Sequence, residues 1–238
     1  MKARIKFRKY GIMRFIGHLD VMRFFQKAMR RADIPIAFTG GYSPHMIMSF
    51  AQPLGVGVTS DGEYLDIELT EKISSQDAVR QLNAVSVEGI EILSFVEISD
   101  DKKASGMTIV AAARYEVTSL ASKKSGEITK PIPSDWQLKI QQFLDQPEIM
   151  VIKKTKKNER EINIRPLIYE MCADEDKLHL FLAAGSEENL KPDLVMQAFL
   201  QFAGINEEET PFHYHRIDVY AAGENGFVSL DSLGKIID

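Results

Sequence analysis

The sequence predicts an α+β fold built from two tandem β-α-β-β-α-β units with antiparallel sheets. Segments whose apolar side chains alternate every second residue, typical of strands, are interspersed with segments whose apolar spacing is three and four, typical of helices. The order of these segments in the first half of the chain recurs in the second half without evident residue-level identity.

The first half opens on a strand and a helix that both carry basic faces. Residues 2–9 alternate apolar with basic side chains, so we expect a half-buried strand with a cationic outer face. The basic members are Lys2, Arg4, Lys6 and Arg8. Residues 18–32 have helical spacing, with an apolar stripe formed by Leu19, Met22, Phe25, Met29 and Ala32.

The remaining elements of the first half follow in the same way. Strands are expected at residues 34–39, 63–70 and 90–98. A helix is expected from Ser74, whose hydroxyl is suited to cap its first turn, to Val85. The polar stretch 100–106 then indicates a boundary between two domains.

The second half repeats this order with a different set of residues. Strands are expected at residues 109–119, 149–157, 160–171, 176–184 and 212–222, and helices at 134–146 and 191–204. Pro192 near the start of the last helix and Gly204 after its end fit the usual preference of helix termini. Each half therefore has the ferredoxin-like pattern, with domains at 1–102 and 103–222 and a C-terminal tail at 223–238.

Composition places the chain among globular proteins. It has 238 residues, 45% of them hydrophobic, and no apolar run approaches the length of a membrane span. The basic N-terminus lacks the apolar core of a signal peptide, so we expect a cytoplasmic protein without membrane contact. The single cysteine, Cys172, excludes an internal disulfide and is expected to be a buried, inert thiol. No cofactor is expected.

Charge is distributed unevenly along the chain. Residues 1–60 carry ten Lys and Arg against two Asp, whereas the remainder carries 19 Lys and Arg against 32 Asp and Glu. A basic first quarter on a chain of net charge −5 indicates an anionic partner that contacts one region.

The basic residues of the predicted helix 18–32 lie on one face without acidic residues between them, and a second basic cluster falls at a predicted hairpin tip near 154–157. We interpret these groups as contacts to RNA, with ordinary solvated surfaces as the alternative. The candidate RNA-binding residues are Lys6, Arg8, Arg23, Lys27, Arg30, Arg31, Lys154, Lys156 and Lys157.

The segment Thr39–Phe50 begins with a glycine-rich loop. Its glycines permit close backbone approach, a tyrosine there can stack on a base, and a histidine there can donate or accept a proton. The candidate ligand-loop residues are Gly40, Gly41, Tyr42, Ser43 and His45. The alternative is a turn between two strands.

Histidines elsewhere raise weaker possibilities. His18 and Asp20 straddle a helix start, where capping competes with an acid–base role, and His213 and His215 share a strand face but lack a third metal ligand of diagnostic spacing. We therefore assign no catalytic residue and no metal site.

The first half also resembles an uncharacterised bacterial family described as radical-SAM-linked or radical-SAM-associated. The resemblance extends over most of residues 1–170 and rests on GHLD at Gly17–Asp20, GYSPH at Gly41–His45, SFA at Ser49–Ala51, PLGV at Pro53–Val56, EYLDIEL at 63–69 and INIRPLI at 162–168. Members are similar to segments fused to, or encoded beside, cobalamin-binding radical-SAM proteins. The chain has no Cys-x-x-x-Cys-x-x-Cys, so the resemblance implies an accessory or substrate-recruiting role beside such an enzyme.

Three hypotheses for function follow. The first is a non-catalytic accessory that binds RNA for a radical-SAM enzyme; the tandem ferredoxin-like pattern, also found in RNA-processing proteins of CRISPR systems, agrees with it only by analogy. The second is a docking module for the same enzyme without nucleic-acid binding. The third is an RNA nuclease that needs no metal and uses His18 or His45.

Overall fold

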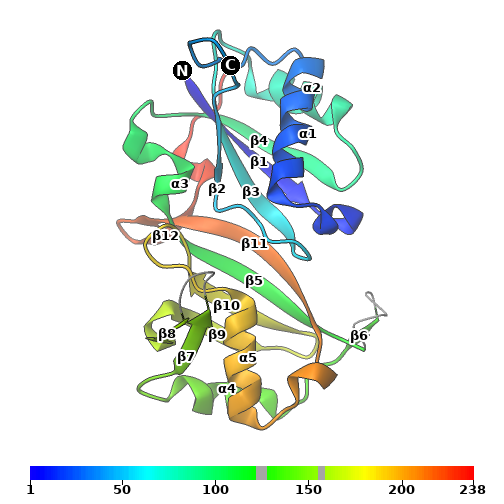
Figure 1. Ribbon diagram of the computed structural model, residues 1–238, viewed down its shortest axis with the longest axis vertical. Coiled ribbons are helices and arrows are strands. Elements are labelled where there is room, and N and C mark those ends of the chain that lie inside the picture. The colour runs from blue at the N-terminus through cyan, green and yellow to red at the C-terminus, as the bar shows by residue number, and fades with distance from the viewer. Residues whose placement is uncertain (122–127, 155–158) are drawn as a thin grey trace. The chain divides into compact units, whose positions relative to one another are not determined.

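A computed structural model describes residues 1–121, 128–154 and 159–238 (Figure 1). The chain divides into two compact units. Unit 1 comprises Met1–Ala112 together with Arg216–Asp238, and unit 2 comprises Ala113–His215. The C-terminal segment therefore returns to the first unit.

Unit 1 is an antiparallel sheet with two long helices. In chain order its elements are β1 (Lys2–Lys9), η1 (Gly11–Phe15), α1 (His18–Arg31), β2 (Met48–Ala51), β3 (Thr59–Glu68), α2 (Ser75–Val85), β4 (Ile90–Ile98), η2 (Lys102–Ala104) and α3 (Gly106–Ile109). Strand β1 lies between β4 and β3, and β2 pairs with β3. Ile5 faces Leu65 on one neighbour and Phe95 on the other, in antiparallel register.

The core of unit 1 lies between one face of this sheet and helices α1 and α2 (Figure 1). Ala3, Ile5 and Phe7, the apolar side of β1, are buried there. The Phe7 and Phe25 rings meet edge to face with centroids 4.7 Å apart, an arrangement that adds to the hydrophobic stabilisation. The expected apolar stripe of α1 is correct for Phe25, but Leu19 is 61% exposed.

Helix ends in unit 1 follow the expected chemistry. The Ser74 hydroxyl accepts a hydrogen bond from the Asp77 N–H and caps α2, as its sequence predicts.

Residues 34–39, expected as a strand, form isolated bridges instead, in which Ile36 faces Leu69 and Phe38 faces Met46.

The C-terminal segment packs on unit 1 rather than forming a loose tail. It contains the end of β11 (Phe212–Gly223), then β12 (Gly226–Ser229) and η5 (Asp231–Leu233). Leu230 and Ile237 are buried, and Ile237 belongs to the core. Lys235 and Glu97 exchange two backbone hydrogen bonds of 2.8 and 2.9 Å. The expectation of a loosely attached tail is therefore wrong, because its apolar residues complete the core.

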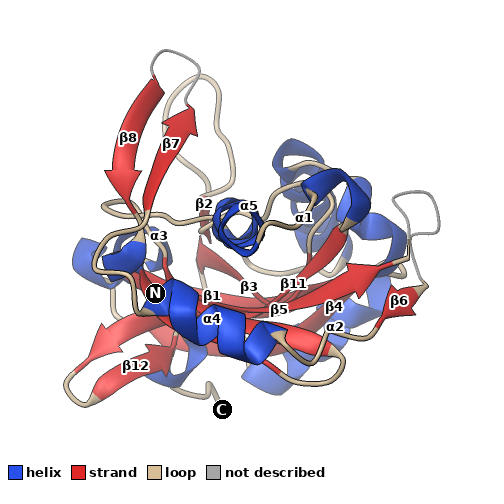
Figure 2. Cartoon of the chain, turned by 90° about the horizontal axis from the view of Figure 1, so that it is seen from below, coloured by secondary structure: helices blue, strands red, loops and turns tan. Residues whose placement is uncertain are grey.

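Unit 2 contains hydrogen-bonded strands, two longer helices and a separate hairpin. In chain order its elements are β5 (Val110–Leu120), β6 (Thr129–Lys130), α4 (Trp136–Leu144), β7 (Met150–Lys154), β8 (Glu159–Asn163), η3 (Arg165–Leu167), β9 (Ile168–Ala173), β10 (Lys177–Ala183), α5 (Pro192–Ala203), η4 (Glu207–Glu209) and the start of β11. The strand order is β5-β10-β9, with β6 beside β5. Strands β7 and β8 form a two-stranded sheet that projects from these elements (Figure 2).

Aromatic residues of α4 and α5 form the core of unit 2. The ring centroids of Trp136 and Phe143 lie 5.2 and 5.7 Å from that of Phe199. Helix α5 begins at Pro192, and Gly204 at its C-terminus has φ +68°, so the predicted helix signals are correct. Cys172 is exposed on β9, beside the buried Met171, so the expectation of a buried thiol is wrong.

The prediction of an α+β chain with a mostly antiparallel sheet is thus confirmed. The sheet that holds most of the strands also contains one parallel pair, so the expectation of antiparallel sheets is correct only in part. Within the described residues, no helix is long and apolar enough to cross a membrane.

Candidate functional site

The solvent face of α1 carries four of the cations that the sequence predicts to bind RNA. Arg23, Lys27, Arg30 and Arg31 are all exposed, on the side of the helix away from its buried residues. Arg23 contacts Asp20 at 3.1 Å, an exposed pair that contributes little to stability. Lys27, Arg30 and Arg31 make no ion pair with any residue in the described ranges. We call these four cations the α1 basic face.

The position of the last two cations has a local physical reason. Arg30 and Arg31 lie in the last turn of α1, where the partial negative charge of the helix C-terminus favours cations. The helix end thereby offsets part of the repulsion between adjacent guanidinium groups. Arg30 and Arg31 can consequently lie side by side without a carboxylate partner in the described residues.

The glycine-rich loop is a turn whose base is closed by hydrogen bonds. The Thr39 N–H donates to the His45 carbonyl at 2.9 Å, and the His45 N–H donates to the Thr39 hydroxyl at 3.1 Å. The His45 ring lies 3.2 Å from the same hydroxyl through Nδ1. Gly41 has φ +98°, a conformation that favours glycine. The backbone therefore reverses direction here, although residues 34–39 before the turn form bridges and not the expected strand.

The side chains of this turn face solvent. Gly40, Gly41, Ser43 and His45 are exposed, and Tyr42 at the tip is 111% exposed. In the part of the chain that the structure describes, Tyr42 makes neither a hydrogen bond nor a ring contact. Its aromatic faces are therefore available to a ligand.

A hollow joins the turn to the end of α1. Its volume is about 340 Å³, and it is lined by Met29, Arg30, Asp33, Ile34, Pro35, Ile36, Phe38 and Met46. Phe38, which is 47% exposed, and Arg30 thus share one concave surface. The structure brings together part of the predicted RNA-binding helix and the base of the predicted ligand loop.

The cations of β1 behave differently from those of α1. Arg4 is buried and binds Asp66 through two bonds, Nε to Oδ1 at 2.7 Å and Nη2 to Oδ2 at 2.9 Å. It also donates to the carbonyls of Leu230 at 3.1 Å and Ala104 at 2.9 Å. The predicted cationic outer face of β1 is therefore wrong at this position, because residues 104–106 and the C-terminal segment cover it.

Lys6 and Arg8, which we expected to contact RNA, are each paired with two carboxylates. Lys6 Nζ lies 2.7 Å from Asp218 and 3.6 Å from Asp231. Arg8 contacts Asp61 at 2.7 Å and Glu91 at 3.2 Å. Their charge is compensated within unit 1, so we leave both outside the candidate surface.

Burial shifts the pKa values of several titratable side chains on and beside β1. It raises the pKa of Asp218 even though Lys6 lies beside the carboxylate. Burial likewise raises the pKa of the Tyr64 hydroxyl, which donates to Asp231 at 3.1 Å. Lys9, whose Nζ donates to the Ile16 carbonyl at 2.9 Å, has its pKa lowered by burial. Asp218, Tyr64 and Lys9 are buried inside the unit, so they are not part of a surface presented to a ligand.

The second basic cluster is only partly described. Lys156, Lys157 and the side chain of Lys154 lie outside the described residues. Lys153 donates to the Asn189 carbonyl at 3.0 Å, and Arg165 donates to the Leu144 carbonyl at 2.6 Å. Two of the neighbouring cations therefore hold the backbone of unit 2.

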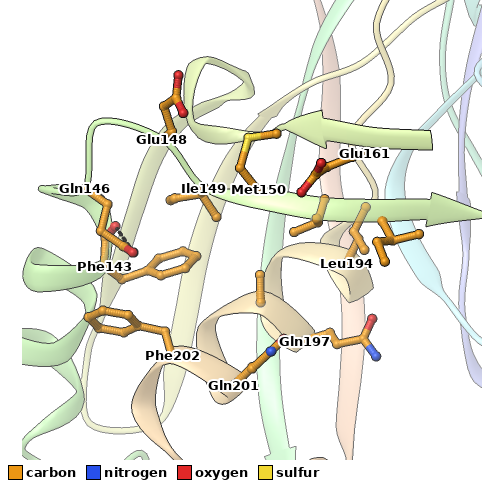
Figure 3. A pocket seen from close by; sticks show the side chains of 13 residues that line it. Phe143, Gln146, Glu148, Ile149, Met150, Glu161, Leu194, Gln197, Gln201 and Phe202 are labelled. Atoms are coloured by element: carbon orange, nitrogen blue, oxygen red, sulfur yellow. Dashed lines mark hydrogen bonds between the residues drawn. The ribbon is translucent and has the colours of Figure 1, made fainter.

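A groove in unit 2 was not foreseen from the sequence. It has a volume of about 700 Å³ and lies between β7, the end of α4 and α5 (Figure 3). Met150, Ile152 and Phe202 line it and are 48%, 58% and 42% exposed. Glu148 and Glu161 add carboxylates at its rim. The apolar side chains of Met150 and Ile152, two residues apart on β7, could have indicated one wall of this groove. The opposite wall, on α5, could not be inferred because α5 lies far away in the sequence.

The histidines of the weaker hypotheses have separate surroundings. His18 packs edge to face against Phe50 with centroids 4.9 Å apart, whereas Asp20 pairs with Arg23. Over the described ranges, no group of three or more His, Cys, Asp or Glu side chains is arranged to hold a metal ion.

These features define an α+β protein with a basic helical face and an adjoining exposed aromatic turn. The family described as "Uncharacterized protein conserved in bacteria (DUF2344)" matches residues 2–192, and the chain belongs to this family. No curated protein matches the chain.

Proposed function

We propose that this protein is a non-catalytic accessory that binds RNA through the α1 basic face and presents it to a radical-SAM enzyme. The observation that supports this proposal most strongly is the set of three exposed, unpaired cations Lys27, Arg30 and Arg31 on one helix. They occur on a chain whose net charge is −5, so the positive field is local.

Binding of RNA to such a face is favoured by the release of counterions from the nucleic acid. A row of cations that contacts phosphates frees the ions condensed on the nucleic acid, which makes the affinity strongly dependent on salt. Such contacts require side chains that are not already neutralised. Lys27, Arg30 and Arg31 meet this requirement, whereas Lys6 and Arg8 do not.

The radical-SAM part of the proposal rests on the resemblance of residues 1–170. With one cysteine, the chain lacks the three-cysteine motif of a radical-SAM enzyme. The radical chemistry would therefore belong to the partner, and this chain would supply substrate recognition.

We also infer a ferredoxin-like arrangement for each unit. In unit 1 the order β4-β1-β3-β2, with α1 after β1 and α2 after β3, agrees with the predicted β-α-β-β-α-β pattern. In unit 2 the order β5-β10-β9, with the hairpin β7–β8 inserted after α4, agrees with the same pattern. This likeness concerns the fold and carries no activity.

A salt titration of RNA binding tests the proposal. We expect the wild-type chain to bind total tRNA or rRNA fragments with an affinity that falls steeply as salt rises. Arg23→Glu/Lys27→Glu should remove most of this binding, because it reverses two exposed charges on α1. Binding that does not depend on salt, or no binding at low salt, would refute the proposal.

The groove of unit 2 favours a second candidate function, a docking module for the radical-SAM partner. Ile149 accepts a backbone bond from Ile164, so the backbone groups of Met150 and Ile152 point away from β8. Within the described residues β7 has no strand partner on that side. An extended partner segment can add there as a third strand, with its apolar side chains in the groove and its cations near Glu148 and Glu161.

Co-purification with a radical-SAM protein from the native host tests the second candidate. Ile152→Asp should reduce recovery of that protein, because the substitution places a carboxylate among apolar lining residues. Leu138→Asp, at an exposed apolar residue of α4 outside the groove lining, is the control and should leave recovery unchanged. Equal recovery with both variants would exclude the groove as the contact.

A further inference from the structure

The aromatic turn beside the α1 basic face has features that phosphate binding alone does not require. Tyr42 is 111% exposed at the tip, and Phe38 is 47% exposed at the base. A single exposed apolar side chain needs no explanation. Here two aromatic residues occur on one hairpin turn, and one of them shares a hollow with a basic-face arginine.

The base of the turn is closed by contacts between its two ends. The Phe38–Met46 bridge and the hydrogen bonds between Thr39 and His45 close its backbone. A tyrosine side chain has two rotatable torsions, so its immobilisation on binding costs little conformational entropy. Tyr42 therefore presents a planar ring at the tip of a turn whose base is closed by hydrogen bonds.

The hollow below the turn adds groups that suit a nucleobase. Phe38 offers a ring face, and Arg30 offers a guanidinium that can contact a phosphate or stack on a base. Asp33 supplies a carboxylate that can accept from a base amino group. A volume of about 340 Å³ gives room for one unstacked base.

Stacking separates two kinds of nucleic acid. In a duplex the base faces are covered by neighbouring pairs, so proteins contact mainly the backbone and the grooves. In a single strand the bases can be splayed out and stacked on aromatic side chains. A protein that combines a cationic track with exposed rings therefore discriminates in favour of unpaired nucleotides.

We propose that Tyr42 and the hollow formed by Phe38, Arg30 and Asp33 bind unpaired bases, so that the ligand of the α1 basic face is a single-stranded nucleic-acid segment. This inference rests on the proposed function, because the α1 basic face must first hold the phosphates. It goes further by assigning the strandedness of the ligand and the residues that read it.

Fluorescence anisotropy with the full chain tests this inference. The probe is an unstructured RNA of about 12 nucleotides, compared with the same strand annealed to its complement and with single-stranded DNA of the same sequence. We expect the single strands to bind more tightly than the duplex. The RNA and DNA arms determine whether the sugar is also recognised.

Substitutions at the tip isolate stacking from charge. Tyr42→Ala should lower single-strand affinity about 5- to 150-fold while leaving the salt dependence unchanged. Tyr42→Phe, which retains the ring, is the matched control and should keep most of the affinity. Because Tyr42 is fully exposed, neither change should alter folding.

The outcomes separate this inference from the proposed function. Salt-dependent binding of single strand and duplex with equal affinity, or an unchanged affinity in Tyr42→Ala, would overturn the stacking site and leave RNA binding intact. No binding of any probe by the wild-type chain would overturn both. Quenching of a 2-aminopurine base in the probe by the wild type but not by Tyr42→Ala would support stacking directly.

Discussion

Strand β1 and helix α1 are both rich in cations, but most of those of β1 are paired with carboxylates whereas most of those of α1 are exposed and unpaired within the described residues. Arg4 on β1 is 1% exposed and pairs with Asp66, and Lys6 has two carboxylate neighbours. On α1, Lys27, Arg30 and Arg31 are exposed and have no ion-pair partner in the described parts of the chain. The two segments look alike in sequence and differ in what surrounds them.

The difference shows that a basic segment is not necessarily a basic surface. A guanidinium under a covering segment loses its hydration, and this cost is offset only when carboxylates and carbonyls replace the water. Arg4 has four such bonds. A cation on an exposed helix keeps its hydration and its field, and it remains available to an anionic ligand. The candidate function therefore belongs to α1.

The largest expected effect comes from Arg4→Met. The substitution would leave the buried Asp66 carboxylate without its guanidinium, and we expect the free energy of unfolding to fall by about 3–5 kcal/mol. Urea denaturation followed by circular dichroism measures it. The matched change on the helix, Arg30→Met, should shift stability by less than about 0.5 kcal/mol. Equal losses in the two variants would contradict the distinction between β1 and α1.

The pH dependence of stability gives a second test of the buried layer. Burial raises the pKa of Asp218 in the folded protein, so the carboxyl binds its proton more tightly when folded than when unfolded. Its contribution to stability is complete below the unfolded pKa, about 3.9, and is lost as the pH rises through the folded value. Asp218→Asn cannot titrate at this position.

We therefore expect wild type to lose stability relative to Asp218→Asn as the pH rises from about 4. Urea denaturation of both proteins over a series of pH values measures the difference, and all other titrating groups largely cancel. Lys6 retains Asp231 in the variant. If the difference in unfolding free energy between the two proteins stayed constant with pH, or changed in favour of the wild type, burial would not be the main influence on the pKa of Asp218.

The smallest expected effect concerns the paired cation of α1. Asp20→Asn removes the partner of Arg23, an exposed contact of 3.1 Å in the first turn of the helix. We expect stability to change by less than about 1 kcal/mol, because exposed pairs and helix-dipole contacts are both weak. Single-stranded RNA should bind a few times more tightly, and isothermal titration calorimetry would detect it. Weaker RNA binding in Asp20→Asn would mean that the α1 basic face is not the contact.

Much of the secondary structure could be predicted because it depends on local patterns. The spacing of apolar residues predicted helices at 18–32 and 191–204, and α1 and α5 lie within these ranges. Pro192 and Gly204 fixed the ends of α5 through backbone geometry. The exposed cations of α1 were also predictable, since they lie opposite its apolar stripe.

Other features depend on contacts between distant residues and were missed. Arg4 is neutralised by Asp66, and Lys6 by Asp218 and Asp231. The alternation of β1 gives no sign that a C-terminal segment covers the basic side. The same reason explains the buried Ile237. The groove of unit 2 escaped prediction because three separate elements form it.

The salt dependence of single-stranded RNA binding, measured for two matched double variants, tests directly whether the α1 basic face holds the phosphates. Arg30→Gln/Arg31→Gln removes two exposed charges from α1. Lys102→Gln/Lys103→Gln removes two exposed charges from η2. This segment is a control because it packs on the face of the sheet opposite α1, where the Ala104 carbonyl accepts a hydrogen bond from Arg4. Both pairs change the net charge equally.

We expect the α1 variant to lower the magnitude of the slope of log affinity against log salt by about 1.4, the value for two lost phosphate contacts to a single strand. The η2 variant should leave the slope as in wild type. Equal reductions in both variants would show attraction by net charge alone, and an unchanged slope in the α1 variant would contradict the assignment of RNA binding to this helix.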